Sequence, residues 1–140
     1  MFTTNSMISI LKQLCGKTNG VLATSSYLAL SQTAPNVEGG GITEPVGGGY
    51  KRAKIGSYQE GSKMGTPTYD SSTGKVTVAN IEEIHFNEAT SGWGTITHFA
   101  IYSQQTGGEP LYVGQLNSAI TPTAGNVVII RVGDIQISLE

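Results

Sequence analysis

The sequence has little of what builds disulfide scaffolds, nucleic-acid-binding surfaces or membrane spans. Its single cysteine, Cys15, excludes a disulfide within the chain. Charged residues make up 13%, about half of the usual share of roughly 25%. The formal net charge of −2 excludes a broad basic surface for a nucleic-acid backbone, and no apolar run approaches the ~18 residues of a membrane-spanning helix. We therefore expect no nucleic acid and no membrane among the partners of this chain.

A signal peptide and a sequence motif for a catalytic serine are also missing. Residues 1–20 lack the basic start and the following apolar run of a signal peptide, so we expect a soluble protein made in the cytoplasm. No Gly-x-Ser-x-Gly elbow for a serine nucleophile occurs. The length fits one domain whose core needs no metal or disulfide to be stable.

Two glycine-containing segments resemble nucleotide-binding motifs without completing them. Gly16-Lys17-Thr18 has the end of a phosphate-binding loop, but Leu11 occupies the position of the first glycine, and the predicted helix precedes the segment instead of following it. The glycine triplets at 39–41 and 47–49 lack the spacing of a dinucleotide fingerprint. We interpret these segments as a helix end and loops, and we expect no cofactor.

The residues that could bind a metal are far apart in the sequence. Cys15, His85 and His98 do not lie within four residues of one another, as a zinc knuckle requires. We expect His98 to be a hydrogen-bonded histidine of the core or of an interface. No metal ligand is assigned.

Paired carboxylates for sugar hydrolysis are the remaining catalytic option. Glu82, Glu83 and Glu88 are close in sequence, but adjacent residues of a strand point to opposite faces, and glutamates are usually solvated on the surface. Trp93, between two glycines, could stack on a sugar, yet a buried tryptophan against closely approaching backbone is the more common arrangement. No catalytic residue is assigned.

The sequence contains many residues that favour β-strands, and these residues are densest around Ser91–Tyr102. Within it, Thr95–Tyr102 combines β-branched and aromatic residues, which favours a pleated, buried strand. One predicted face consists of every second residue from Thr95, and the other of every second residue from Ile96. Both faces mix apolar and polar groups, whereas a strand with one solvated face alternates cleanly between the two kinds. We therefore predict a central strand that is covered on both sides, by a second sheet or by another chain.

A short helix over Ser6–Cys15 is predicted after a loose arm at Met1–Asn5. Five apolar residues have the i, i+3, i+4, i+7, i+8 spacing of one helical face, namely Met7, Ile10, Leu11, Leu14 and Cys15. Asn5 or Ser6 would cap the start of this helix, and Gly16 would end it in a left-handed conformation. Because so short a helix is unstable alone, its apolar stripe must dock on the sheet or on a partner.

The rest of the chain is predicted as short strands separated by turns. Two long polar segments interrupt it, the loop Gln32–Gly49 and the turn-rich stretch Gly56–Gly74. Loops of this length are usually functional or disordered, and their glycines are either mobile or held by close backbone contacts. The predicted strands are Ser26–Ser31, Tyr50–Ile55, Lys75–Ile81, Glu83–Phe86, Thr95–Tyr102, Leu111–Leu116, Asn126–Val132 and Ile135–Glu140, the last with Ile135, Ile137 and Leu139 facing inward.

This order of elements predicts a mainly β protein, because strands follow one another without intervening helices. We predict a single domain over 1–140, with an N-terminal arm and helix at 1–18. Residues 19–140 are predicted as an antiparallel β-sandwich, either jelly-roll-like or Ig-like.

A set of short motifs occurs in a fixed order along most of the chain. In the N-terminal half these are Tyr27-Leu28-Ala29-Leu30-Ser31, Thr43-Glu44-Pro45 and Gly47-Gly48-Gly49-Tyr50 before a basic residue. In the C-terminal half they are Ala89-Thr90, Trp93-Gly94-Thr95, Thr97-His98, Thr106-Gly107-Gly108, Leu111-Tyr112-Val113-Gly114-Gln115-Leu116 and Gly125-Asn126. In this order they resemble a family of small bacteriophage virion proteins of the tail or tail-fibre type. Gln104-Gln105 departs from the Asp-Ala that is more frequent in that family.

The resemblance implies a structural component of the virion without catalytic activity. It implies assembly with copies of itself and with other virion proteins, and it favours a trimer because phage fibres and decorations are commonly threefold. It leaves open a position on the head, as a capsid decoration or head-fibre protein. A carbohydrate-binding or hydrolysing tail module is the alternative from another functional class.

Overall fold

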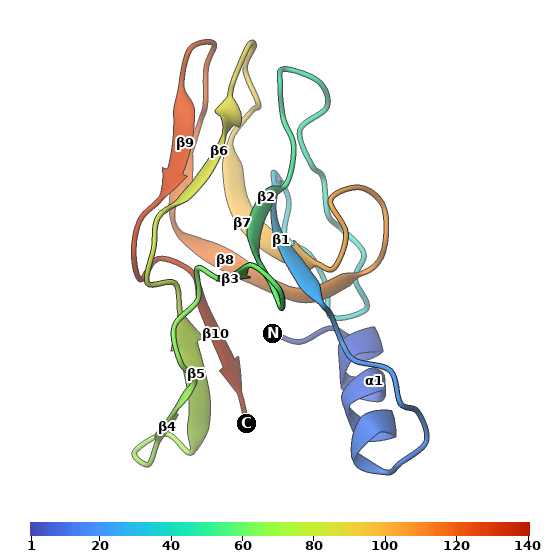
Figure 1. The fold of residues 1–140 in the computed structure, drawn as a ribbon. Coiled ribbons are helices and arrows are strands. Elements are labelled where there is room, and N and C mark those ends of the chain that lie inside the picture. Colours follow the sequence, from blue (N-terminus) through green and yellow to red (C-terminus); the bar gives the residue numbers. More distant parts are fainter.

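Three antiparallel sheets form the framework of the molecule (Figure 1), in a computed structural model that describes residues 1–140. The mainly β, antiparallel sandwich predicted from the sequence is confirmed. No helix has the length and the apolar character needed to cross a membrane. The elements in chain order are α1 (Thr4–Leu14), β1 (Ser25–Ser31), β2 (Ala53–Ser57), β3 (Gly61–Ser62), β4 (Thr68–Asp70), β5 (Lys75–Ala79), β6 (Ile84–Glu88), β7 (Ile96–Tyr102), β8 (Pro110–Ile120), β9 (Val127–Ile130) and β10 (Gln136–Leu139).

The largest sheet has five strands in the order β3-β2-β1-β7-β8. As predicted, β7 lies inside a sheet, because it pairs with β1 on one edge and with β8 on the other. Phe99 stands opposite Gly114 across the β7–β8 pair, and a Cβ atom at Gly114 would lie only 2.6 Å from its ring. The glycine in β8 therefore leaves room for the Phe99 ring to lie flat against the strand.

Two smaller sheets, β10-β5-β4 and β6-β9, complete the sandwich. In Figure 1 they extend in opposite directions from one side of the five-stranded sheet. The inward positions of β6 and β9 alternate with exposed ones, which is the period of a half-buried strand. The main core joins the three sheets through Leu28, Leu30, Ala53, Ile55, Ile84, Phe86, Ala89, Trp93, Ile96, Phe99, Ile101, Tyr112, Leu116, Val128, Ile130 and Ile135.

The second face of β7 is covered by a loop. Ala100 and Tyr102 are buried there with residues of β1 and β8, and Ile42 from the Gln32–Gly49 loop packs against them. The predicted covering on both sides is confirmed, but the predicted cover, a second sheet or another chain, is wrong for this face. The predicted division of faces is also wrong at Ile96, because a bulge between Ile96 and His98 turns Ile96 into the main core.

The predicted loose arm at Met1–Asn5 is wrong, because the arm extends the edge of the five-stranded sheet. Phe2 pairs with Tyr112 of β8, and backbone hydrogen bonds join Thr3 to Leu111 and Met1 to Val113. The helix consequently starts earlier than predicted, and its cap is Thr3 instead of Asn5 or Ser6. Its end is as predicted, with Gly16 in the left-handed region at φ +70°.

Two strands in the stretch Gly56–Gly74 were not predicted. The short strands β3 and β4 consist of Gly, Ser, Thr, Tyr and Asp, and backbone pairing with β2 and β5 creates them without an apolar alternation that a sequence could reveal. The strand predicted at Tyr50–Ile55 lies later, at Ala53–Ser57.

Candidate functional site

Trp93 lies in an aromatic cluster of the core. It is only 2% exposed, its ring meets the ring of Tyr50 edge to face at 5.3 Å, and Phe86 lies 6.4 Å away. The indole N–H donates a hydrogen bond to the carbonyl oxygen of Gly48 at 2.8 Å. The predicted packing role of Trp93 is confirmed, because its ring has no open face for a sugar.

The glycines at 47–49 are held by the loop that contains Trp93. All three have positive φ angles, which favour glycine. A Cβ atom at Gly48 would lie 2.7 Å from the Ser91 Oγ atom and 3.1 Å from the indole, and one at Gly49 would lie 2.7 Å from the Glu88 carbonyl oxygen. Of the two predicted states of these glycines, close backbone contact is the one observed for Gly48 and Gly49.

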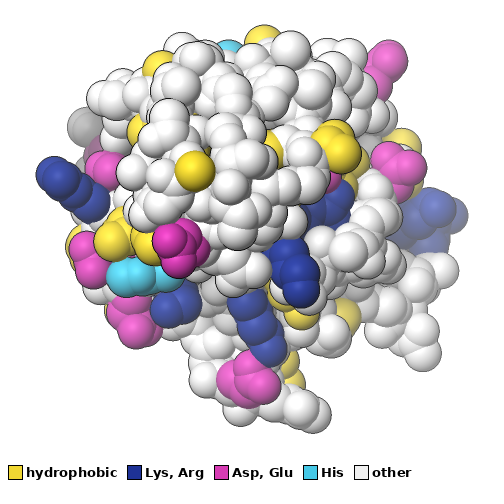
Figure 2. All heavy atoms as spheres, turned by 90° about the horizontal axis from the view of Figure 1, so that it is seen from above, with side chains coloured by type: hydrophobic (Ala, Val, Ile, Leu, Met, Phe, Trp, Pro, Cys, Tyr) yellow, Lys and Arg dark blue, Asp and Glu magenta, His cyan; other side chains and the backbone are white.

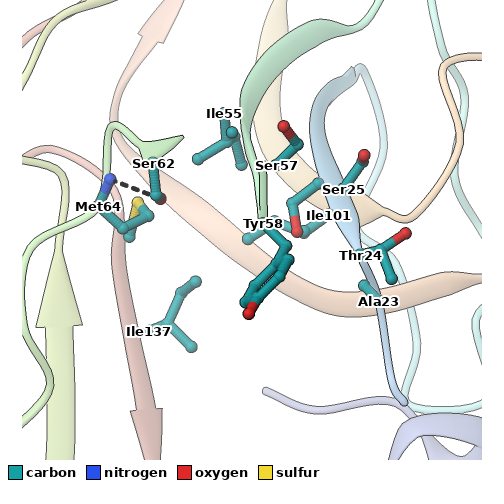
Figure 3. Close-up of a pocket in the computed structure, with 12 residues that line it drawn as sticks. Ala23, Thr24, Ser25, Ile55, Ser57, Tyr58, Ser62, Met64, Ile101 and Ile137 are labelled. Atoms are coloured by element: carbon teal, nitrogen blue, oxygen red, sulfur yellow. Dashed lines mark hydrogen bonds between the residues drawn. The ribbon is translucent and has the colours of Figure 1, made fainter. Parts of the chain in front are cut away.

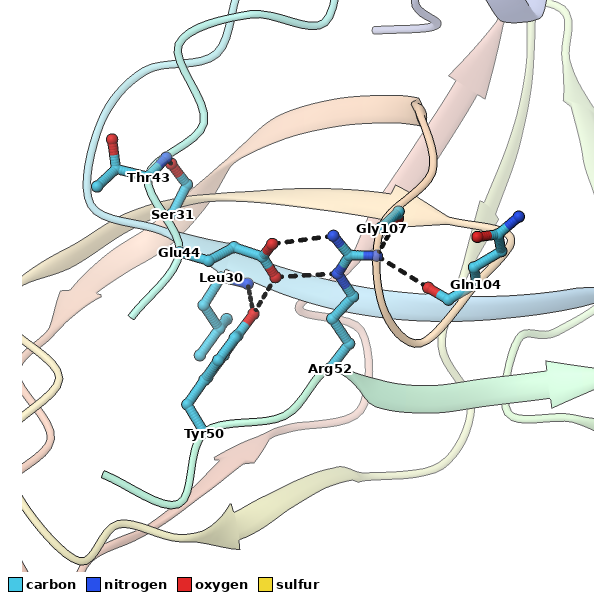
Figure 4. Close-up of polar contacts among 8 residues, drawn as sticks. All are labelled: Leu30, Ser31, Thr43, Glu44, Tyr50, Arg52, Gln104 and Gly107. Carbon is cyan, nitrogen blue, oxygen red and sulfur yellow. Dashed lines mark hydrogen bonds and ion pairs between the residues drawn. The ribbon is translucent and has the colours of Figure 1, made fainter. Parts of the chain in front are cut away.

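Arg52 fastens the long loop to the second face of the large sheet (Figure 4). Its Nε and Nη2 atoms donate to the two carboxylate oxygens of Glu44 at 3.0 and 2.9 Å. Its Nη1 atom donates to the carbonyl oxygens of Gln104 and Gly107 at 2.9 and 2.7 Å. The guanidinium also lies over the ring of Tyr102. Because Arg52 is only 7% exposed, this two-point pair is largely shielded from water.

Tyr50 completes this contact with Glu44. Its hydroxyl donates to a Glu44 carboxylate oxygen at 2.7 Å and accepts a hydrogen bond from the Leu30 N–H at 3.0 Å. Burial raises the pKa of Tyr50, and the hydrogen bond to Glu44 raises it further. Burial also raises the pKa of Tyr102, against the opposing effect of the Arg52 charge. Both phenols are therefore held in the neutral form and contribute to structure.

The residues considered for metal binding and catalysis are scattered over the surface. Cys15 is exposed and follows the last residue of the helix. His98 is half-buried and its Nδ1 atom lies 2.7 Å from the Thr97 hydroxyl, as expected for a hydrogen-bonded histidine. His85 lies 3.5 Å from Glu83 on the surface. Three metal-ligating side chains do not come together anywhere in the structure.

The acidic residues considered for sugar hydrolysis do not form a shielded pair. Glu82, Glu83 and Glu88 are all exposed. Glu82 lines a shallow hollow with Lys54, Glu60, Lys63 and other residues of β2 and β3, while Glu83 lies beside His85. A glycosidase holds its catalytic carboxyl groups on either side of the bond that it cleaves, in a site shielded from bulk water, whereas these three glutamates are exposed.

The most unusual surface feature is apolar. The stripe on α1 that was expected to dock is uncovered, with Leu11 60% and Leu14 78% exposed. A second uncovered group, Tyr69, Val76 and Leu139, lies on the sheet β10-β5-β4. The prediction that Leu139 faces inward is wrong, because it shares a face with the partly buried Ile137 but is itself 45% exposed. Isolated exposed apolar residues are normal, but grouped ones mark contact sites.

The face seen from above in Figure 2 has a different character. It consists mostly of uncharged side chains and backbone, with small separate apolar patches, and charges of both signs lie along its edges and across its lower half in this view. Such a surface offers many hydrogen-bonding groups and no strong field of one sign. The arrangement as a whole can make contacts with a neighbour.

Sequence reasoning missed the ion pair between Glu44 and Arg52 and the exposed apolar group on the small sheet. The motifs Thr43-Glu44-Pro45 and Gly47-Gly48-Gly49-Tyr50 before Lys51 and Arg52 were the only signal for the former. These motifs place an acidic residue, a tyrosine and two basic residues close together in the sequence, but they do not indicate which side chains form an ion pair. For the exposed apolar group there was no signal, because exposure depends on where the neighbouring sheets end.

Comparison with known proteins identifies a family. A family model described as podophage GP4 fiber I protein gp80 matches residues 2–138. A comparison with curated proteins finds no match. The matched region runs from the N-terminal arm through the helix and the three sheets into the last strand. This chain therefore belongs to the family of the podophage GP4 fiber I protein gp80, a family of phage fibre proteins.

Proposed function

We propose that this protein is a non-enzymatic building block of a bacteriophage tail fibre, which assembles with copies of itself and with other virion proteins. The observation that carries the proposal is the match to a fibre protein family over nearly the whole chain. Its uncovered apolar groups on α1 and on β10-β5-β4 support it, since they have no partner within one copy.

The rigid attachment of the loops supports a passive structural role. The loop Gln32–Gly49 is fixed by the Glu44–Arg52 pair and by the packing of Gly48 against Trp93. Loops that are held in this way present a constant surface, so that binding a neighbour costs little ordering entropy. A subunit in a fibre needs this property more than it needs a mobile lid.

Self-association is the first part of the proposal to test. We expect the purified protein to sediment as a homo-oligomer at micromolar concentration, and we propose a trimer, with three times the 14.7 kDa mass of one chain. The threefold number follows from the resemblance to phage fibre and decoration proteins. A single species of 14.7 kDa across the accessible concentration range would contradict self-assembly.

The position in the particle is the second part. We expect a density map of the whole phage to place this chain in a tail fibre, in agreement with the family description. Density for the chain on the capsid surface would instead make it a head decoration. In either position the chain would lie in the virion, so the map separates the two structural alternatives from each other.

The absence of catalysis is the third part. We expect no turnover of a capsular polysaccharide by the purified protein, because Glu82, Glu83 and Glu88 are solvated. Their combined replacement by Gln is the control. Hydrolysis by the wild-type chain that disappears in this triple variant would contradict the proposal and favour a hydrolysing tail module.

A further inference from the structure

One face of the sheet β10-β5-β4 is apolar along its whole length. Leu139 stands opposite Val76, and Val76 stands opposite Tyr69. Ile137 stands opposite Val78 on the same face, because residues two apart on a strand point the same way. The other face carries only polar residues and one alanine, namely Thr68, Asp70, Lys75, Thr77, Ala79, Gln136 and Ser138.

Only half of this apolar face is covered within the chain. Ile137 packs against the main core, but the sheet continues past the core, and Tyr69 at its far end is 67% exposed. The sheet thus has one apolar and one polar face, like a layer of a β-sandwich. Over the end that carries Tyr69, however, no second layer packs on the apolar face.

A hollow of about 260 Å³ continues the same face toward the large sheet (Figure 3). Its apolar lining includes Ile137 on β10, Met64 before β4, and Ile55 and Ile101 from β2 and β7. Figure 3 places Tyr58 between Ile137 and the ends of β1 and β2. Since a cavity of about 150 Å³ accepts a benzene-sized molecule, this hollow has room for large aliphatic side chains.

The helix α1 carries a matching apolar stripe that its own chain leaves free. Met7, Leu11 and Leu14 follow the i, i+4, i+7 spacing of one helical face and are all exposed. The helix is attached only near its first turn, where Ser6 is its single buried residue. Its stripe can therefore be buried by a partner without any change in its attachment.

We propose that α1 of one copy docks its apolar stripe on the apolar face of β10-β5-β4 and on the adjoining hollow in a second copy. This inference rests on the proposed self-assembly and names the surfaces that it uses. The helix of the same chain is a poor occupant. The hydroxyls of Thr3 and Ser6 donate to the carbonyl oxygens of Pro110 and Leu111 on β8, and Figure 1 shows α1 and β10-β5-β4 projecting separately from the body.

The distribution of charge along the chain favours this arrangement over a pairing of two helices. Lys12 and Lys17 are the only charged side chains among residues 1–37, whereas the remaining residues carry six Lys or Arg and ten Asp or Glu. The helical part is thus cationic and the β part has a formal charge of −4. Two helices would repel each other, while a helix is attracted to the negatively charged β part of a neighbour. At the tip of the sheet β10-β5-β4, Lys75 pairs with Glu140 at 3.1 Å, and Asp70 leaves this end with a net negative charge.

The proposed contact is heterologous, because it joins two different surfaces. A heterologous contact repeats from copy to copy and closes into a ring when its rotation allows. In a ring of three copies, α1 of each copy would dock on the sheet β10-β5-β4 of the next copy. The contact is thus compatible with the proposed trimer, in which every stripe and every apolar face is covered.

Substitution of both surfaces tests the contact. Leu11→Asp and Leu139→Asp place a charge at an exposed position of each surface, so we expect unchanged thermal unfolding of the monomer. Association should weaken by about 100-fold or more, because an apolar contact is lost and a charge would be buried. Val46→Asp, at a residue that is 99% exposed on the long loop, is the matched control and should leave sedimentation unchanged.

A disulfide experiment identifies the partner of the helix. Cys15 is the only cysteine and lies at the end of the stripe. Wild-type chain mixed with the double variant Cys15→Ser, Leu139→Cys should give a mixed disulfide dimer under mild oxidation. Dimers of the wild-type chain alone, without mixed dimers, would show helix–helix pairing and overturn the inference.

The outcomes distinguish the inference from the function on which it rests. A wild-type chain that is monomeric contradicts self-assembly, and with it this contact. A wild-type oligomer that persists in both Leu11→Asp and Leu139→Asp contradicts the contact alone. An oligomer that persists in both variants is also the result expected if the hollow binds a sugar or another virion protein, and it overturns the inference in those cases as well.

Discussion

The guanidinium carbon of Arg52 lies 3.4 Å from the centre of the Tyr102 ring. Arg52 directly precedes β2 and Tyr102 ends β7, so the contact links the segment before one strand to the end of another that is not its neighbour in the sheet. On its other side the same guanidinium holds Glu44 in the long loop (Figure 4). One side chain therefore fixes the Gln32–Gly49 loop and the turn after β7 against the same face.

Arg52→Ala should lower the free energy of unfolding by about 3 kcal/mol, because it leaves a partly buried Glu44 without its partner and removes the cation–π contact. Arg52→Lys should recover only part of this loss, since an ammonium cannot make the two-point contact. Urea unfolding measures both changes. Lys51→Ala, at the exposed neighbour, should stay within about 0.5 kcal/mol of the wild type. Equal losses at positions 51 and 52 would contradict the importance assigned to the Glu44–Arg52 pair.

The glycines at 47 and 48 provide a matched pair for backbone and packing effects. Both have positive φ, but a Cβ atom at Gly47 would meet open space, whereas one at Gly48 would collide with Ser91 and Trp93. Gly47→Ala should cost about 1 kcal/mol of stability for the left-handed backbone, and Gly48→Ala about 3 kcal/mol because of the added overlap. Thermal unfolding of the two variants checks the difference. Equal effects would mean that the loop moves away from Trp93 without cost.

The buried phenols predict a loss of stability at high pH. Burial raises the pKa of Tyr50 and of Tyr102 in the folded protein, while an unfolded tyrosine ionises near pH ~10. Their contribution is therefore complete below pH ~10 and decreases as pH rises above it, because only the unfolded state then gains from ionisation.

Tyr50→Phe tests this pH dependence. At pH 8 the variant should be less stable by about 1 kcal/mol, since the Leu30 N–H loses its acceptor and Glu44 loses a donor. Between pH 8 and 11 the variant should lose less stability than the wild type. Tyr58→Phe, at an exposed tyrosine, is the control and should follow the wild-type profile. Parallel curves for wild type and Tyr50→Phe would contradict the assigned role.

The elements that were predictable from the sequence are those whose apolar pattern is local. The β-branched and aromatic residues of Thr95–Tyr102 revealed β7, and the spacing of Met7, Leu11 and Leu14 revealed α1. Gly16 marked the helix end because only glycine adopts its φ angle easily. In each case the residues that carry the signal also form the element.

The features that escaped prediction depend on partners far away in the chain. The N-terminal arm is ordered by hydrogen bonds to β8, more than 100 residues later, and its own residues carry no strand pattern. The helix stripe was expected to dock, but its pattern alone could not reveal that the sheet offers it no surface within the same chain. Glu44 and Arg52 likewise look like solvated charges until the loop folds over the sheet.

Asn80 should be among the least replaceable polar residues. It is buried, its amide donates to the carbonyl oxygens of Glu82 and Arg131, and its side-chain oxygen accepts from the Ile135 N–H. It thereby joins the end of β5 to the segment between β9 and β10. Asn80→Ala should cost about 3 kcal/mol because three backbone groups lose their partner in the core.

Asn80→Asp refines this prediction. The variant keeps the shape of the side chain but turns a carboxylate toward two carbonyl oxygens, so it should be at least as unstable as Asn80→Ala at pH 7. Asn87→Ala, at an exposed position of β6, should stay within about 0.5 kcal/mol of the wild type. Urea unfolding ranks the three variants, and wild-type stability in Asn80→Asp would contradict the hydrogen-bond assignment.

Ser6 controls whether α1 stays attached. Its hydroxyl donates to the Leu111 carbonyl oxygen at 2.6 Å, and it is the only buried residue of the helix. Ser6→Ala should weaken the attachment by about 1 kcal/mol, so amides of residues 7–14 should exchange with deuterium about five-fold faster. Amides of β7 should keep their wild-type rates, because the core does not depend on the helix. Asn5→Ala, at an exposed position, should change neither set. Faster exchange in β7 as well would mean that the helix opens only when the whole chain unfolds.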